Sequence, residues 1–141
     1  VASQIYPPSL TLTQENTDNK SADVLDMNVE LRDGNITTRV YCKADAFPFQ
    51  VVSMPFLESN LDKGVCYRVF YGQVIRFQRL CSKREDFEIR TRFLLAILKD
   101  RGYKVGWLGR QFCRAVAKYI SDFQKWDIPL DVKGWFNSIA G

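Results

Sequence analysis

The sequence predicts an α+β fold, with an N-terminal antiparallel β-hairpin at about residues 24–42 followed by a three- to four-helix bundle at about residues 64–139. Apolar residues alternate strictly on both sides of an Asp-Gly pair, and from Gly64 onward they recur at helical spacing. A chain of 141 residues, 46% of them hydrophobic, is long enough to bury a core. We therefore expect two regions, with hairpin and linker in 1–63 and the helices in 64–141.

The hairpin prediction depends on Asp33-Gly34, because glycine tolerates the positive φ that a two-residue turn requires. Closing the chain there puts a mostly apolar set of pairs on one face, namely Leu31 with Ile36, Val29 with Thr38, Met27 with Val40 and Leu25 with Cys42. The same register pairs Arg32 with Asn35, Glu30 with Thr37, Asn28 with Arg39 and Asp26 with Tyr41 on the other face. We expect the apolar face to be buried.

Four helices are expected after a winding linker at 43–63. The first runs from Gly64 to a capping box, Ser82-Lys83-Arg84-Glu85, which also starts the second helix at about 83–101. Gly102 ends the second helix, the third covers about 105–124, and a short fourth follows Pro129.

Several kinds of chemistry have little support. The chain has no His, which excludes Ser/His and Cys/His nucleophile pairs. Zinc sites need closely paired ligands, so we interpret the widely spaced cysteines as free thiols: Cys42, Cys66, Cys81 and Cys113. Asp26 and Glu30 share a strand face and are the candidates for a Mg²⁺-dependent nuclease site. No apolar run approaches the roughly 18 residues of a membrane span, and we expect an intracellular protein, nuclear or cytoplasmic.

Positive charge is concentrated in the middle of the chain. Residues 1–63 carry a net charge of −4, residues 64–118 carry +9, and residues 119–141 carry −1. Two predicted helices hold the basic residues in stripes. In the first helix an arc of roughly 80° at 100° per residue contains Arg68, Arg76, Arg79 and Lys83, with Tyr67 and Tyr71 beside it. The third helix stacks Arg110, Arg114 and Lys118 at intervals of four residues.

A basic stripe has three interpretations: an ordinary solvated face, a membrane surface, or a nucleic-acid contact. Like charges at i,i+4 destabilise a helix by a few tenths of a kcal/mol per pair. An anionic partner compensates for that cost, and the bulky apolar residues are needed for the bundle core rather than for a bilayer. These considerations favour phosphate contacts.

Four stretches in order resemble the end of a reverse transcriptase from Penelope-like and related eukaryotic retroelements. They are VLDMNVELRDGNITTRVYCKADAFPF, MPFLESN, YRVFYGQVIRFQRLCSKREDF and LLAILKDRGY, and the resemblance covers roughly residues 22–115. The matching positions are Val24-Leu25-Asp26, Tyr41, Lys43, Asp45, Phe47, Tyr67, Gln73-Val74-Ile75-Arg76, Cys81-Ser82, Asp86-Phe87 and Gly102-Tyr103. Arg68 stands where the family usually has Gly, and Gly72 where it has Ser.

The resemblance implies that the hairpin is similar to a primer grip, with Arg32, Asp33, Gly34 and Asn35 at its tip. The helices would form a thumb that holds an RNA–DNA or DNA/RNA duplex, with Gln73 among its contacts. The Tyr-x-Asp-Asp box that binds catalytic Mg²⁺ is absent, so we expect no catalytic residue and no cofactor in this chain. The palm and fingers of the same polyprotein are a further expected partner.

Two origins stay open. Because the chain begins at Val1, we expect an excised or processed piece, but a domesticated remnant that lost its palm fits equally. Such a remnant could instead serve as a protein-interaction module without a nucleic-acid role, in which the basic faces meet an acidic protein.

Overall fold

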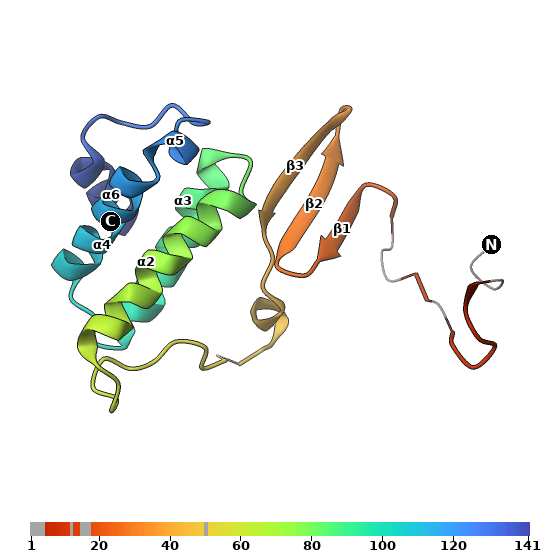
Figure 1. The fold of residues 1–141 in the computed structure, drawn as a ribbon, viewed down its shortest axis with the longest axis horizontal. Helices are drawn as coiled ribbons and strands as arrows, with labels where there is room; N and C mark the ends of the chain where they lie inside the picture. The colour runs from red at the N-terminus through yellow and green to blue at the C-terminus, as the bar shows by residue number, and fades with distance from the viewer. Residues whose placement is uncertain (1–4, 12, 15–17, 50) are drawn as a thin grey trace.

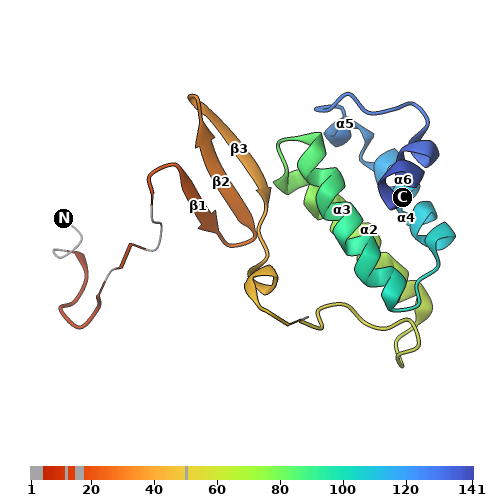
Figure 2. The same cartoon turned by 180° about the vertical axis from the view of Figure 1, so that it is seen from behind.

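The α+β prediction is confirmed by a computed structural model, which describes residues 5–11, 13–14, 18–49 and 51–141. A three-stranded antiparallel sheet of order β1-β2-β3 precedes the helices (Figure 1). The strands are β1 (Ser21–Val24), β2 (Met27–Arg32) and β3 (Asn35–Val40). Turning the molecule by 180° shows the sheet to one side of the helices in both views (Figure 2).

The predicted register of β2 and β3 is confirmed at six positions, from Met27–Val40 to Arg32–Asn35. Asp33 has φ 51° and Gly34 has φ 78°, the positive values that the two-residue turn requires. The strand β1 extends the hairpin to a sheet and was not predicted. It pairs with β2 through a turn at Leu25 and Asp26, so Leu25 does not face Cys42 as expected but lies in the turn and is 91% exposed.

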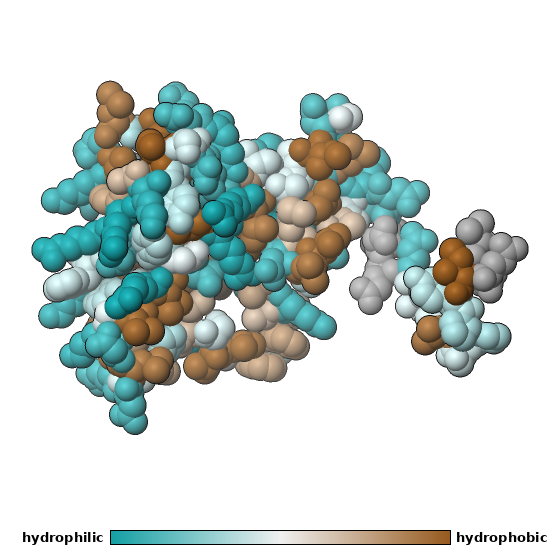
Figure 3. Space-filling model, in the orientation of Figure 1, coloured by the Kyte–Doolittle hydropathy of each residue, from teal (hydrophilic) through white to brown (hydrophobic). Residues whose placement is uncertain are grey.

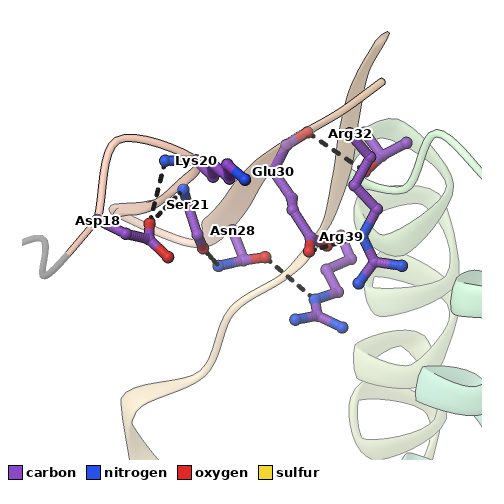
Figure 4. Close-up of polar contacts among 8 residues, drawn as sticks. Asp18, Lys20, Ser21, Asn28, Glu30, Arg32 and Arg39 are labelled. Atoms are coloured by element: carbon purple, nitrogen blue, oxygen red, sulfur yellow. Dashed lines mark hydrogen bonds and ion pairs between the residues drawn. The ribbon is translucent and has the colours of Figure 1, made fainter. Parts of the chain in front are cut away.

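The prediction that the apolar face of the sheet is buried is wrong. We call this face, formed by Ala22, Val24, Met27, Val29, Leu31, Ile36, Thr38 and Val40, the apolar face of the sheet, and within the described residues only Val40 of it packs against the core. Leu31 and Ile36 on it are 45% and 67% exposed, whereas Asn28 on the opposite face is only 9% exposed. Asn28 donates to Ser21 and accepts from Arg39 (Figure 4). It also donates to the Asp23 carboxylate.

The reason is that the sheet meets the helices by an edge rather than by a face. The Thr38 amide donates to the Ser82 hydroxyl at 3.0 Å, and the Ser82 amide donates to the Thr38 carbonyl at 2.9 Å. Ser82 thereby continues the hydrogen bonding of β3 and does not cap the next helix. The predicted capping box is absent, since the N-cap is Lys83 and it makes no side-chain cap bond.

Five helices follow: α2 (Lys63–Leu80), α3 (Arg84–Asp100), α4 (Val105–Lys118), α5 (Ile120–Phe123) and α6 (Val132–Ala140). Asp62 caps α2 by accepting from the Val65 amide, and Asp131 caps α6 by accepting from the Gly134 amide. The predicted third helix is divided at Tyr119 into α4 and α5. Of the helices in the described parts of the chain, none is both long and apolar enough to cross a membrane.

The core lies wholly among the helices and contains an aromatic cluster. Phe87 of α3 is fully buried, with ring centroids of four neighbours 5.1 to 6.3 Å from its own, those of Phe112, Phe123, Trp126 and Trp135. Burying such rings supplies much of the free energy that holds helices together. The linker carries a short 3-10 helix, η1 (Lys43–Ala46), and is attached to α3 by an Asp45–Arg90 ion pair of 2.6 Å.

Candidate nucleic-acid interface

The two basic stripes meet where α2 and α4 pack side by side (Figures 1 and 2). Arg79 of α2 lies 5.7 Å from the ring centroid of Tyr119, and Lys118 of α4 lies 5.9 Å from the same ring. In the opposite direction, Arg114 of α4 lies 5.8 Å from the ring centroid of Tyr71 on α2. Each of the two tyrosines therefore contacts an arginine of the neighbouring helix, so the cations of α2 and α4 lie close together.

We call this surface the basic face and define it by five exposed cations and the two tyrosines: Arg68, Arg79, Arg110, Arg114, Lys118, Tyr71 and Tyr119. Arg68 belongs to it by helical geometry, because it lies about 20° from Arg79 around α2. Within the described residues, no ion pair involves any of the five cations. Hydrophilic residues dominate the surface over α2 and α4 (Figure 3).

Gly72 leaves the backbone of α2 open in the middle of the basic face. A Cβ added there would have no heavy atom within 4 Å. Glycine inside a helix costs about 0.5–1 kcal/mol relative to alanine, and no packing contact in the described structure accounts for it. A positively charged surface without a side chain at this position allows close approach of a bulky polyanion.

Arg76 and Lys83 do not belong to the basic face, although the predicted arc included both. The guanidinium of Arg76 turns toward the sheet, where it contacts the Asp26 carboxylate at 2.8 Å and donates to Gln73. Lys83 lies beyond the end of α2 at Leu80, so helical spacing no longer fixes its direction. It lines a hollow between the sheet and α3 together with Arg39, Glu85 and Asp86.

Tyr67 is a core residue and does not belong to the basic face. It is 7% exposed, its hydroxyl accepts from the Lys104 amide at 3.0 Å, and its ring packs edge-on against Tyr103. Gln73 is half-buried and bonded to Arg76, so it too points away from the basic face.

The hairpin tip lies apart from the basic face. Arg32, Asp33, Gly34 and Asn35 are exposed at the end of the sheet, on the side of the molecule away from α4 in both views (Figures 1 and 2). Arg32 contacts Glu30 at 2.7 Å, and Figure 4 shows both side chains on the polar face of the sheet.

Asp26 and Glu30 do not form a metal site with each other, because each is paired with a different arginine, Arg76 and Arg32. The part of the chain that the structure describes contains no group of three His, Cys, Asp or Glu side chains able to hold a metal ion. All four cysteines are free thiols.

Two aromatic residues on or beside this surface were not predicted as site residues. Tyr119 was expected in the apolar face of its helix, and Trp107 was not singled out. Trp107 is 50% exposed, and Arg110 lies 4.8 Å from the centroid of its ring. The sequence did contain a signal for both residues: on the predicted helix, Trp107 lies three positions before Arg110, and Tyr119 lies next to Lys118.

Comparison of the chain with known protein families, with characterised proteins and with solved structures finds no match.

Proposed function

We propose that this chain binds an RNA–DNA or DNA/RNA duplex through its phosphates, as the thumb-like segment of a retroelement reverse transcriptase that is not catalytic by itself. The observation that carries the proposal is that cations from two helices meet around Tyr71 and Tyr119 without partner carboxylates in the described structure. The proposed location is intracellular, nuclear or cytoplasmic, where such a duplex is made.

Phosphate contact suits these residues. A guanidinium presents a planar fork that donates two hydrogen bonds to one phosphate. The neighbouring rings of Tyr71 and Tyr119 hold Arg114 and Arg79 near the surface, so less side-chain freedom is lost when a duplex binds. Such contacts fix the position of a duplex without reading its sequence.

The salt dependence of binding tests the proposal. If four phosphates are contacted, log K for a hybrid duplex should fall with log[salt] at a slope between about −3 and −4. Replacing Arg79, Arg114 or Lys118 by Gln should each reduce the slope by about one unit. Fluorescence anisotropy of a labelled hybrid duplex measures both quantities.

Lys83→Gln is the matched control, because it removes the same charge from a residue outside the basic face. Its slope should equal that of the unaltered chain. A flat salt response, or an equal loss of slope in Lys83→Gln, would reject the proposed interface.

The reverse-transcriptase assignment is supported by the order of the four resembling stretches, from Val24-Leu25-Asp26 to Gly102-Tyr103. The catalytic carboxylates and their Mg²⁺ would belong to the palm. We therefore expect this chain alone, with Mg²⁺ and nucleotides, to leave a primed template unextended. Extension of the primer by the purified chain would contradict the assignment.

A second candidate function is a protein-interaction module without a nucleic-acid role, and the apolar face of the sheet favours it. Val24, Leu31 and Ile36 are 51%, 45% and 67% exposed and lie together on that face. Figure 3 shows hydrophobic residues gathered over the sheet. Exposed apolar patches of this kind mark interaction sites.

The proposed partner for this second function is a separate protein, whose apolar residues cover this face and whose acidic residues meet the basic face. The palm and fingers of the same polyprotein are a proposed partner of the first candidate, because a remnant with the second function has lost its palm. If a plain hybrid duplex binds to the chain with the salt slope given above, the second candidate is wrong. If heparin binds to the chain but the hybrid duplex does not, the first is wrong.

A further inference from the structure

A groove of about 550 Å³ lies between the first two turns of α4 and α6. Two glycines shape it. A Cβ on Gly106 would meet no heavy atom within 4 Å, so the groove is open there. A Cβ on Gly109 would lie 2.9 Å from the Phe136 ring, so α6 approaches α4 closely at that turn and closes the bottom.

The lining of the groove combines aromatic surface with positive charge. Trp107 and Phe136 contribute rings, and Arg110 and Lys133 contribute cations. No Asp or Glu lines it in the described structure, and the neighbouring Asp131 uses its carboxylate to cap α6. Trp107 is half-exposed, whereas Trp126 and Trp135 are 8% and 2% exposed.

The groove continues the basic face, because Arg110 belongs to both. Its guanidinium lies 4.8 Å from the centroid of the Trp107 ring, which makes a combined indole and guanidinium platform. Single-stranded nucleic acids are held by this combination, with bases stacked on aromatic or guanidinium planes and phosphates beside cations.

We propose that this groove takes an unpaired nucleotide at the end of the bound duplex, with its base stacked on Trp107 and Arg110. A phosphate next to that base contacts Lys133. The inference rests on the proposed function, since the duplex on the basic face delivers the unpaired end. Stacking uses the flat face that every base has, so binding at this groove does not depend on the base.

The test compares a blunt hybrid duplex with the same duplex carrying a four-nucleotide single-stranded overhang, using the full chain. We expect the overhang to increase affinity and to quench the fluorescence of Trp107. Trp107→Ala should remove the gain, which for one stacked base corresponds to about 5- to 150-fold. Because Trp107 also contacts Arg110 of the basic face, the gain is measured as the ratio of the overhang and blunt affinities within the same variant.

Gly106→Leu is the second variant, because it fills open space in the groove while Trp107 and Arg110 remain. It should also remove the gain from the overhang, and Gly106→Ala, which adds only one methyl group, should retain most of it. Thermal unfolding of both variants checks that the fold is intact.

Each outcome separates the two proposals. Equal affinity for blunt and overhang duplexes without fluorescence quenching overturns the groove proposal and leaves duplex binding in place. Binding of neither duplex overturns the proposed function itself. If an acidic apolar peptide quenches the fluorescence of Trp107 and the overhang does not, the groove binds a protein partner, and the proposal that it binds a nucleotide is overturned.

Discussion

Phe87 shows how much one side chain contributes to this bundle. It is fully buried on α3, and rings from α4, α5 and the C-terminal segment surround it. We predict that Phe87→Ala lowers the free energy of unfolding by about 3–5 kcal/mol, since it removes a buried ring and leaves a cavity. Phe93→Ala on the same helix, where the ring is 49% exposed, should cost about 1 kcal/mol or less. Urea unfolding measures both, and equal losses would contradict the packing.

The thiol of Cys113, which lines the groove, leads to a prediction about the pH dependence of its alkylation. Burial raises the pKa of the Cys113 thiol, while Lys133 partly opposes the shift. Only the thiolate reacts with alkylating reagents, so a raised pKa means less thiolate and slower alkylation at neutral pH. In a Cys42→Ser variant, we expect the alkylation rate of Cys113 to reach half its maximum above pH about 8.5, the ordinary value. Lys133→Gln should move the midpoint higher, and a midpoint at or below the ordinary value would contradict the burial.

At the residue scale, the sequence predicted on which side of a helix a side chain lies better than it predicted which residues that side chain contacts. Helical spacing correctly put Arg79, Arg114 and Lys118 on exposed faces. It did not predict that Arg76 would contact Asp26, because that contact joins an element 50 positions earlier in the chain. Tyr67 lies at the border of the predicted face, where small rotations decide between core and surface, and its neighbours Tyr103 and Lys104 place it inside.

Helices and strands were predictable where residues close in sequence determine where they begin, end or pair. Asp33-Gly34 set the register of β2 and β3, and Gly102, with φ 85°, ends α3. The buried face of the sheet was not predictable, because alternation tells which residues share a face but not which face meets a neighbour. The end of α2 at Leu80 depends on Ser82, whose bonds to β3 are contacts of long range in the sequence.

The C-terminal end of α2 is stabilised by a lysine from the segment that follows α5. The Lys125 ammonium donates to the carbonyls of Gln78 at 2.5 Å and Cys81 at 2.8 Å, where the helix leaves carbonyls without partners. We predict that Lys125→Met lowers the free energy of unfolding by about 1–3 kcal/mol, the cost of leaving those carbonyls unpaired. Lys43→Met, an exposed lysine of η1, should change it by less than about 0.5 kcal/mol. Thermal and urea unfolding compare the two, and an unaffected Lys125→Met variant would contradict this capping role.

On the scale of the whole molecule, the helices form the core by themselves, and one segment of the linker, residues 54–57, packs against them. Every buried hydrophobic side chain in the described structure lies between Cys66 and Ile139, and Val40 is the sheet residue that packs against them. Linker residues 54–57 are attached to the α3–α4 turn. Arg101 donates to the Met54 carbonyl, the Tyr103 hydroxyl donates to Pro55 at 3.0 Å, and the Leu57 amide donates to Arg101 at 3.1 Å.

Those contacts predict where the chain divides into folding units. A piece comprising residues 51–141 should unfold cooperatively with a helical circular dichroism spectrum, because it keeps the whole core and the attached linker segment. A piece comprising 64–141 should unfold at a clearly lower urea concentration, since Arg101 and Tyr103, now 5% and 4% exposed, lose their carbonyl partners and the cover of Leu57. Arg101→Met in the longer piece should reproduce part of that loss. If both pieces are equally stable, the linker segment contributes nothing to the bundle, and if the longer piece is unfolded, the sheet is part of the folding unit.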